Sequence, residues 1–121
     1  MHELSMIQRV LEMALTVSEE HEKRPIRGIT MEIGQLRHMV PSALEFAFEA
    51  ATQGTRAEGA AFEWRLIPLE VLCQVCETRY EPENEFWLCP ECGSPRGIPT
   101  RGDELNLVEV ELADSATGEA P

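Results

Sequence analysis

C73-Q-V-C76 and C89-P-E-C92-G93 decide the fold of this 121-residue chain, and together they contain all four of its cysteines. Each Cys-x-x-Cys pair places two thiolates at one tight turn, and four thiolates complete the closed tetrahedron that Zn²⁺ prefers in structural sites. Pro90 stiffens the second turn, and Gly93 is free to take the positive φ that such a turn often needs. The spacing therefore predicts a structural zinc site made by Cys73, Cys76, Cys89 and Cys92.

Two disulfides or a rubredoxin-like iron site are the alternatives for four cysteines. The first residues, M1-H-E-L-S-M-I-Q-R-V10, lack the basic stretch and following apolar run of a secretory signal. We therefore expect a cytoplasmic chain with reduced thiols. No segment approaches the roughly 20 apolar residues of a membrane-spanning helix, so we expect no membrane insertion.

The chain is strongly acidic, with a formal net charge of −12. A ligated zinc with four thiolates would bring the total to about −14. Nucleic-acid-binding zinc ribbons carry Lys and Arg near their cysteines, and acidic residues dominate that neighbourhood here. The charge argues against a nucleic-acid partner and favours cations or basic proteins. A closed zinc site, without a nucleophile-base pair or a Gly-rich phosphate loop, also predicts that the protein is not an enzyme.

Apolar periodicity predicts two helices and two strands ahead of the cysteines. The first helix runs from Glu3 to about Glu22, and the second begins at Pro41 and ends at Gly54. The expected strands are Ile29 to Ile33, ended by Gly34, and Phe62 to Leu66, ended by Pro68. The apolar face of the first helix comprises Leu4, Ile7, Leu11, Ala14 and Leu15, widened by Val10, Met13 and Val17. The apolar face of the second comprises Leu44, Ala47, Phe48 and Ala51.

After the cysteines, E104-L-N-L-V-E-V-E-L112 predicts a last strand that returns to the first sheet. Val108, Val110 and Leu112 alternate with Glu109 and Glu111, whereas Leu105 and Leu107 are out of phase and indicate a bulge or bend near Leu107. The stretch from Leu69 to Thr100 is poor in large aliphatic residues, so it needs its ion to fold. We expect an α+β protein with a two-helix, three-stranded domain (1–68 plus 101–112), an inserted zinc domain (69–100) and a flexible tail (113–121).

His2 is the second candidate metal ligand. Its imidazole Nδ1 and its own backbone nitrogen can close one chelate ring, and either the Met1 amine or the Glu3 amide can close an adjacent ring. Such nitrogen-rich ligation suits Ni(II) or Cu(II) better than Zn(II). Affinity should depend on pH, because the imidazole and the amides must lose protons. The alternative is that His2 is merely an exposed terminal residue.

Several segments, in order along nearly the whole chain, resemble the HypA/HybF family of nickel-delivery factors for [NiFe]-hydrogenase maturation. The similar segments are M1-H-E-L-S-M6, E32-I-G-Q-L36, A43-L-E-F-A-F-E49, C73-x-x-C76, L88-C-P-x-C-G93 and G102-D-E-L-N-L-V-E-V-E-L112. The resemblance implies an α/β nickel domain carrying an inserted Zn(Cys)₄ domain. It assigns zinc to the four cysteines and nickel to His2, with Glu3 beside it as an amide or carboxylate ligand.

The same resemblance implies partners. These are a HypB-type GTPase and a [NiFe]-hydrogenase large-subunit precursor, and some relatives also serve urease, which suggests urease accessory proteins. One departure follows E-I-G, where family members often place an acidic residue that is available as an additional nickel contact, whereas this chain has Met39 and Val40. His38 lies close by and could replace that contact, although we interpret it as an exposed loop residue without a metal role and His21 as solvated. The competing function is a zinc-ribbon adaptor that binds proteins without transferring nickel.

Overall fold

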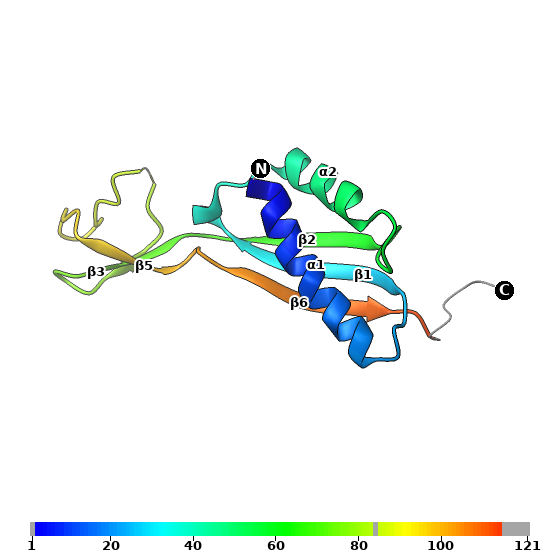
Figure 1. The fold of residues 1–121 in the computed structure, drawn as a ribbon. Coiled ribbons are helices and arrows are strands. Elements are labelled where there is room, and N and C mark those ends of the chain that lie inside the picture. Colours follow the sequence, from blue (N-terminus) through cyan, green and yellow to red (C-terminus); the bar gives the residue numbers. More distant parts are fainter. Residues whose placement is uncertain (1, 84, 115–121) are drawn as a thin grey trace. The chain divides into compact units, whose positions relative to one another are not determined.

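The computed structural model describes residues 2–83 and 85–114. In this described part of the chain, two helices and six strands follow one another, with a short 3₁₀ helix η1 (Gln35–Arg37) between β1 and α2 (Figure 1). The elements are α1 (His2–Glu20), β1 (Ile26–Gly34), α2 (Pro41–Thr52), β2 (Ala61–Ile67), β3 (Glu70–Cys73), β4 (Arg79–Tyr80), β5 (Gly97–Arg101) and β6 (Leu105–Leu112).

The described residues form two compact units. The helical unit comprises residues 2–32, 39–65 and 105–114, and the cysteine unit comprises residues 33–38 and 66–104. Each unit is associated with one three-stranded sheet, of strand order β2-β1-β6 in the first case and β4-β3-β5 in the second. This is the expected α+β architecture with an inserted cysteine-bearing part. Residues 115–121 of the predicted tail lie outside the described part of the chain.

Helix α1 buries one apolar stripe against the rest of the helical unit. The buried members are Met6, Ile7, Val10, Leu11 and Ala14. Met13 was expected to widen this stripe, but it is 38% exposed, and Met6 at 5% is buried instead. The end of α1 is fixed by buried Ser18, whose hydroxyl donates to the Arg24 carbonyl (2.6 Å) and accepts from Arg56 Nε (2.9 Å).

The second helix and the first strand form where the sequence predicts them, although α2 ends at Thr52 with Gln53 as its C-cap and β1 already begins at Ile26. Pro41 occupies the start of α2, and Leu44, Ala47 and Phe48 are buried. The Phe48 ring stacks on Phe62 of β2, with centroids 4.3 Å apart. In β1, the alternating residues Ile29, Met31 and Ile33 are all 2% exposed or less. Figure 1 shows α1 crossing the strands of this sheet with α2 beside it.

Strand β6 returns to the first sheet, as expected, and pairs with β1, but the exposure of its side chains differs in part from the prediction. Leu105, Leu107, Val110 and Leu112 are half-buried, whereas Val108 is 43% exposed. The alternation changes phase between Leu107 and Val110, in agreement with the bulge or bend predicted near Leu107, and only the placement of Val108 with Val110 and Leu112 is wrong.

The cysteine unit contains three strands that the sequence did not reveal. β3 pairs antiparallel with β4, with Val71 opposite Tyr80, and with β5, with Leu72 opposite Ile98. One small cluster of buried residues lies around these strands, and two of its members are cysteines. The cluster comprises Leu69, Val71, Cys73, Tyr80 and Cys89, with Leu36 and Trp87 packed against it.

The G34-Q35-L36 segment is bound into the cysteine unit through its backbone. The Gly34 N–H donates to the Glu104 carbonyl and the Leu36 N–H donates to the Gly102 carbonyl, both at 2.7 Å. A Cβ on Gly34 would lie only 2.1 Å from the Gly102 carbonyl oxygen. Gln35 Oε1 in turn accepts from the Leu69 N–H at 2.7 Å. Glycine is therefore required at position 34 by close approach of two backbones.

Candidate metal centre

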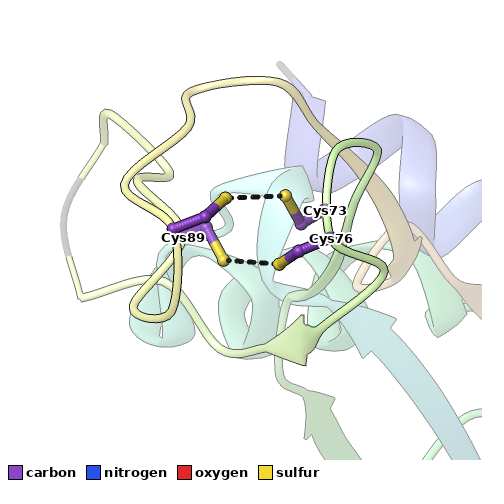
Figure 2. A group of neighbouring side chains, drawn as sticks. Cys73, Cys76 and Cys89 are labelled. Carbon is purple, nitrogen blue, oxygen red and sulfur yellow. Dashed lines mark hydrogen bonds between the residues drawn. The ribbon is translucent and has the colours of Figure 1, made fainter.

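The four cysteines converge from two loops. Their sulfur atoms all lie within 4.8 Å of one another, and among the described residues they form the one cluster of metal-ligand type. Sγ of Cys73 lies 3.6 Å from Sγ of Cys92, and Sγ of Cys76 lies 3.5 Å from Sγ of Cys89. Figure 2 shows Cys73 and Cys76 on one loop facing Cys89 on the other.

This arrangement fits a tetrahedral metal ion. A Zn–S bond of about 2.3 Å implies sulfur-sulfur edges of about 3.8 Å, close to the two separations above. Because all four sulfurs lie within 4.8 Å of one another, a regular ZnS₄ centre would need no sulfur-sulfur separation to shorten by more than about 1 Å. Four sulfurs leave no open coordination position, so the chemistry supplied by such an ion is structural.

The two loops that carry the cysteines have the same pattern of backbone hydrogen bonds to sulfur. In the first, the Val75 N–H donates to Cys73 Sγ at 3.4 Å. In the second, the Glu91 N–H donates to Cys89 Sγ at the same distance. The first cysteine of each loop is buried, and the second, Cys76 or Cys92, is exposed. Each loop therefore presents one protected and one accessible sulfur.

The equivalence extends to the end of each turn. The Glu77 N–H donates to the Cys73 carbonyl at 2.9 Å, and the Gly93 N–H donates to the Cys89 carbonyl at 2.8 Å. Both donors have positive φ, 67° at Glu77 and 77° at Gly93. The predicted conformation of Gly93 is confirmed. Glu77 adopts the same conformation with a side chain that disfavours it.

Backbone and hydroxyl donors prepare the sulfurs for a cation. The N–H groups of Cys76 and then Val75 outweigh desolvation and hold the pKa of Cys73 at about 6, below its usual 9. The Thr78 hydroxyl, followed by the Thr78 N–H, lowers the pKa of Cys76. Thiolates are the metal-binding form of cysteine, so these donors favour ligation.

Cys92 shows the opposite behaviour. The Ser94 N–H lowers the pKa of Cys92, but desolvation and the other three sulfurs outweigh it and raise that pKa to about 12. Four thiolates this close repel one another, and a bound dication would replace the remaining protons. The donor set thus suits a divalent metal.

The surface around the cysteines is acidic, as the sequence indicated. Five exposed carboxylates lie along this stretch, at Glu77, Glu81, Glu83, Glu85 and Glu91. Of the two nearby cations, Arg79 lies 3.7 Å from Glu70 and is thereby partly neutralised. This charge pattern does not match a phosphate backbone.

Glu3 has a structural role that the sequence did not indicate. It is only 9% exposed, and its Oε2 accepts a 2.9 Å hydrogen bond from the Val40 N–H. Val40 precedes Pro41 as the N-cap residue of α2, and its own side chain makes no capping hydrogen bond to the helix. The carboxylate lies near the positive end of that helix, where a negative charge is favoured. Although position 40 itself lacks an acidic side chain, Glu3 brings a carboxylate to it.

The other predicted site residues are placed as follows. His2 begins α1, but its side chain and Met1 lie outside what the structure describes. His38 is exposed and has a φ of 53°. The imidazole Nδ1 of exposed His21 lies 2.8 Å from the Val17 carbonyl oxygen. Over residues 2–83 and 85–114, neither helix combines the length and apolarity needed to cross a bilayer.

Comparison with known proteins gives a consistent result over nearly the whole chain. Residues 1–112 match the family described as hydrogenase/urease nickel incorporation, metallochaperone, hypA. A hydrogenase maturation factor HypA from Geobacter sulfurreducens is 38% identical over 112 residues, covering 93% of this chain and 99% of that protein. The factor of the same name from Methylocella silvestris is 36% identical, with the same two coverages.

Solved structures agree on the fold. The solution structure of the Ni metallochaperone HypA from Helicobacter pylori superposes with a TM-score of 0.68 at 23% identity, covering 93% of this chain and 97% of that one. A second solution structure of a HypA protein gives a TM-score of 0.70 at 22% identity, covering 95% and 98%.

Proposed function

The chain belongs to the HypA family of hydrogenase/urease nickel-incorporation metallochaperones, and from this premise we propose that its M1-H2-E3 segment captures Ni(II) for delivery to [NiFe]-hydrogenase. The family match over residues 1–112, which includes this segment, carries the proposal. The four cysteines hold a structural zinc, and the protein acts in the cytoplasm as a carrier that performs no chemistry on a substrate.

We propose that His2 supplies its imidazole Nδ1 and its backbone nitrogen to nickel. The position of His2 at the start of α1 supports this, because the amides of a first helical turn are not part of the i→i−4 ladder. A metal can take nitrogens at this end while the rest of the helix keeps its hydrogen bonds. The positive end of the helix dipole opposes a cation, which favours moderate affinity and hence release.

For Glu3 we propose the backbone amide, not the carboxylate, as the nickel ligand. The carboxylate is buried and engaged with the Val40 N–H, so ligation through it would cost that hydrogen bond. The carboxylate instead positions the start of α1 beside the start of α2. We further propose that the ion passes to a HypB-type GTPase and then to the hydrogenase large-subunit precursor, with urease accessory proteins as alternative recipients.

Replacing His2 with Ala tests the proposal. Nickel affinity, measured by equilibrium dialysis on untagged protein, should fall by at least about 100-fold, while zinc content and the far-UV spectrum stay unchanged. His21→Ala is the matched control and should bind nickel normally. Unchanged nickel affinity in folded His2→Ala protein would instead favour the zinc-ribbon adaptor.

Two variants at Glu3 separate the possible ligands. Glu3→Gln keeps an acceptor for the Val40 N–H and should retain nickel affinity within about threefold, whereas Glu3→Ala removes the acceptor and should weaken binding further. An equally large loss of nickel affinity in both variants would identify the carboxylate as a ligand.

One extra residue before Met1 displaces the native amine, so retained square-planar absorption of the nickel complex would show that this amine is dispensable.

A further inference from the structure

A groove of about 600 Å³ lies between α2 and β2 in the helical unit. Its aromatic lining comes from Phe46, Phe48 and Phe62, and the Phe48 and Phe62 rings are stacked. Phe46 is 69% exposed, the highest value among the large apolar residues of this unit that the structure describes. A large exposed aromatic next to a groove is typical of a binding surface.

Carboxylates complete the lining of this aromatic groove. Glu45 and Glu49 contribute to it from α2, one turn apart. Glu45 Oε2 also accepts from Trp64 Nε1 of β2 at 3.4 Å, which fixes its position beside the strand. With the chain's net charge of −12, the groove is complementary to a segment that carries Lys or Arg.

The strand beside the groove has an unpaired edge. In the part of the chain that the structure describes, β2 is an outer strand of its sheet and pairs only with β1. An outer strand presents a row of backbone N–H and C=O groups that a further strand can use. A helical ligand would leave these groups to water, whereas an extended ligand would bond them and place alternate side chains in the groove.

We propose that the aromatic groove is a docking site for an extended segment of a partner protein, which adds to β2 as a strand. The segment carries a large apolar side chain that packs on Phe46, Phe48 and Phe62, and it carries Lys or Arg beside Glu45 and Glu49. Backbone pairing supplies affinity, and the aromatic floor with its carboxylates supplies selectivity. The inference is independent of the nickel proposal, because no groove residue belongs to the M1-H2-E3 segment.

The first experiment selects ligands from a displayed random library of peptides of about eight residues, using the full zinc-loaded chain as target. Enriched sequences should alternate β-branched or aromatic residues with Lys or Arg. Isothermal titration of one enriched peptide should show saturable binding, and amide signals of β2 should shift in an NMR titration. N-methylation of alternate peptide amides should abolish binding, because it removes the donors of strand pairing.

Protein variants then locate the site. Phe46→Ala should weaken peptide binding at least about tenfold, as expected for a central aromatic contact, and Glu45→Gln with Glu49→Gln should weaken it about fivefold. The exposed position of Phe46 means that its removal should leave the melting temperature unchanged. Val108→Ala, which truncates a different exposed apolar residue, is the matched control, and neither it nor His2→Ala should alter binding.

Three outcomes would overturn the proposal. The first is a failure of the library to enrich any sequence, and the second is binding that survives both N-methylation and Phe46→Ala. The third is a concentration-dependent dimer, seen by sedimentation, that Phe46→Ala disperses. That last result would assign the groove to a second copy of this chain.

Discussion

The helical unit and the cysteine unit obtain their stability from different sources. The helical unit buries apolar residues from both helices, which include Ile7, Val10, Leu11, Leu44 and Phe48. The buried cluster of the cysteine unit has five members, of which Cys73 and Cys89 are also proposed metal ligands. The first unit can be held by the hydrophobic effect, whereas we propose that the second depends on a bound metal ion. One chain thus combines two folding strategies.

Removal of the metal should produce the largest difference between the units. A chelator should unfold the cysteine unit, seen as collapse of the β3 and β5 amide signals in NMR spectra, because four mutually repelling sulfurs then lack their cation. Helical ellipticity from α1 and α2 should persist, and excess zinc should restore the lost signals. Loss of helical ellipticity at the same chelator concentration would contradict the claim that the two units are stabilised separately.

Truncation of the apolar core should destabilise the helical unit and leave the cysteine unit intact. Leu44 is fully buried, so Leu44→Ala should lower the free energy of unfolding of the helical unit by about 3 kcal/mol. Phe46→Ala, which removes a more exposed side chain on the same helix, should change it by less than about 0.5 kcal/mol. Urea denaturation followed by ellipticity measures the free energy of unfolding of both variants. Loss of zinc from Leu44→Ala protein at the urea concentration that unfolds its helices would argue against separate stabilisation of the two units.

Glycines inside the two sheets should also respond differently. A Cβ at Gly97 of β5 would lie 2.2 Å from Val71 Cγ1 and 2.8 Å from the Tyr80 hydroxyl, so Gly97→Ala should destabilise the cysteine unit by about 2 kcal/mol. At Gly28 of β1 the atom nearest to an added Cβ is a carboxylate oxygen at the end of the Glu111 side chain, 3.3 Å away. Gly28→Ala should therefore change thermal stability by less than about 1 kcal/mol. Equal losses in calorimetry would refute the steric explanation.

The smallest effect concerns the two equivalent turns of the metal centre. Glu77→Gly should raise the stability of the cysteine unit by about 1 kcal/mol, because glycine adopts the observed φ of 67° without strain. Glu77→Gln keeps the strain but removes the negative charge near the sulfurs, so it isolates the electrostatic part. Competition with a zinc-binding dye measures both variants. A gain in Gln equal to that in Gly would attribute the effect to charge.

Periodic apolar patterns predicted most of the helical unit. Both helices, the three strands of its sheet and the return of the last strand to that sheet are confirmed. The phase change predicted near Leu107 of β6 agrees with the observed exposure pattern, but Val108, expected on the same face as Val110 and Leu112, is exposed, because a strand with apolar residues in both phases does not specify which of them is buried at the change. The burial of Met6 was not predicted, because this residue lies at the edge of the apolar stripe of α1.

The cysteine unit was predictable in its ligand spacing but not in its strands. β3, β4 and β5 are short and carry few large aliphatic residues, so no periodic signal marks them. The hydrogen bond between Glu3 and Val40 joins residues 37 positions apart, and no local pattern reveals it. Such contacts depend on the assembled fold.

The binding of G34-Q35-L36 into the cysteine unit has a practical consequence for exchanging parts between relatives. An exchange limited to the contiguous segment 66–104 would remove the partners of the Gly34 and Leu36 amides and would bring a foreign backbone against Gly34. Residues 33–38 should therefore be exchanged together with that segment in any chimera. The unit of modular exchange in this protein is discontinuous in sequence.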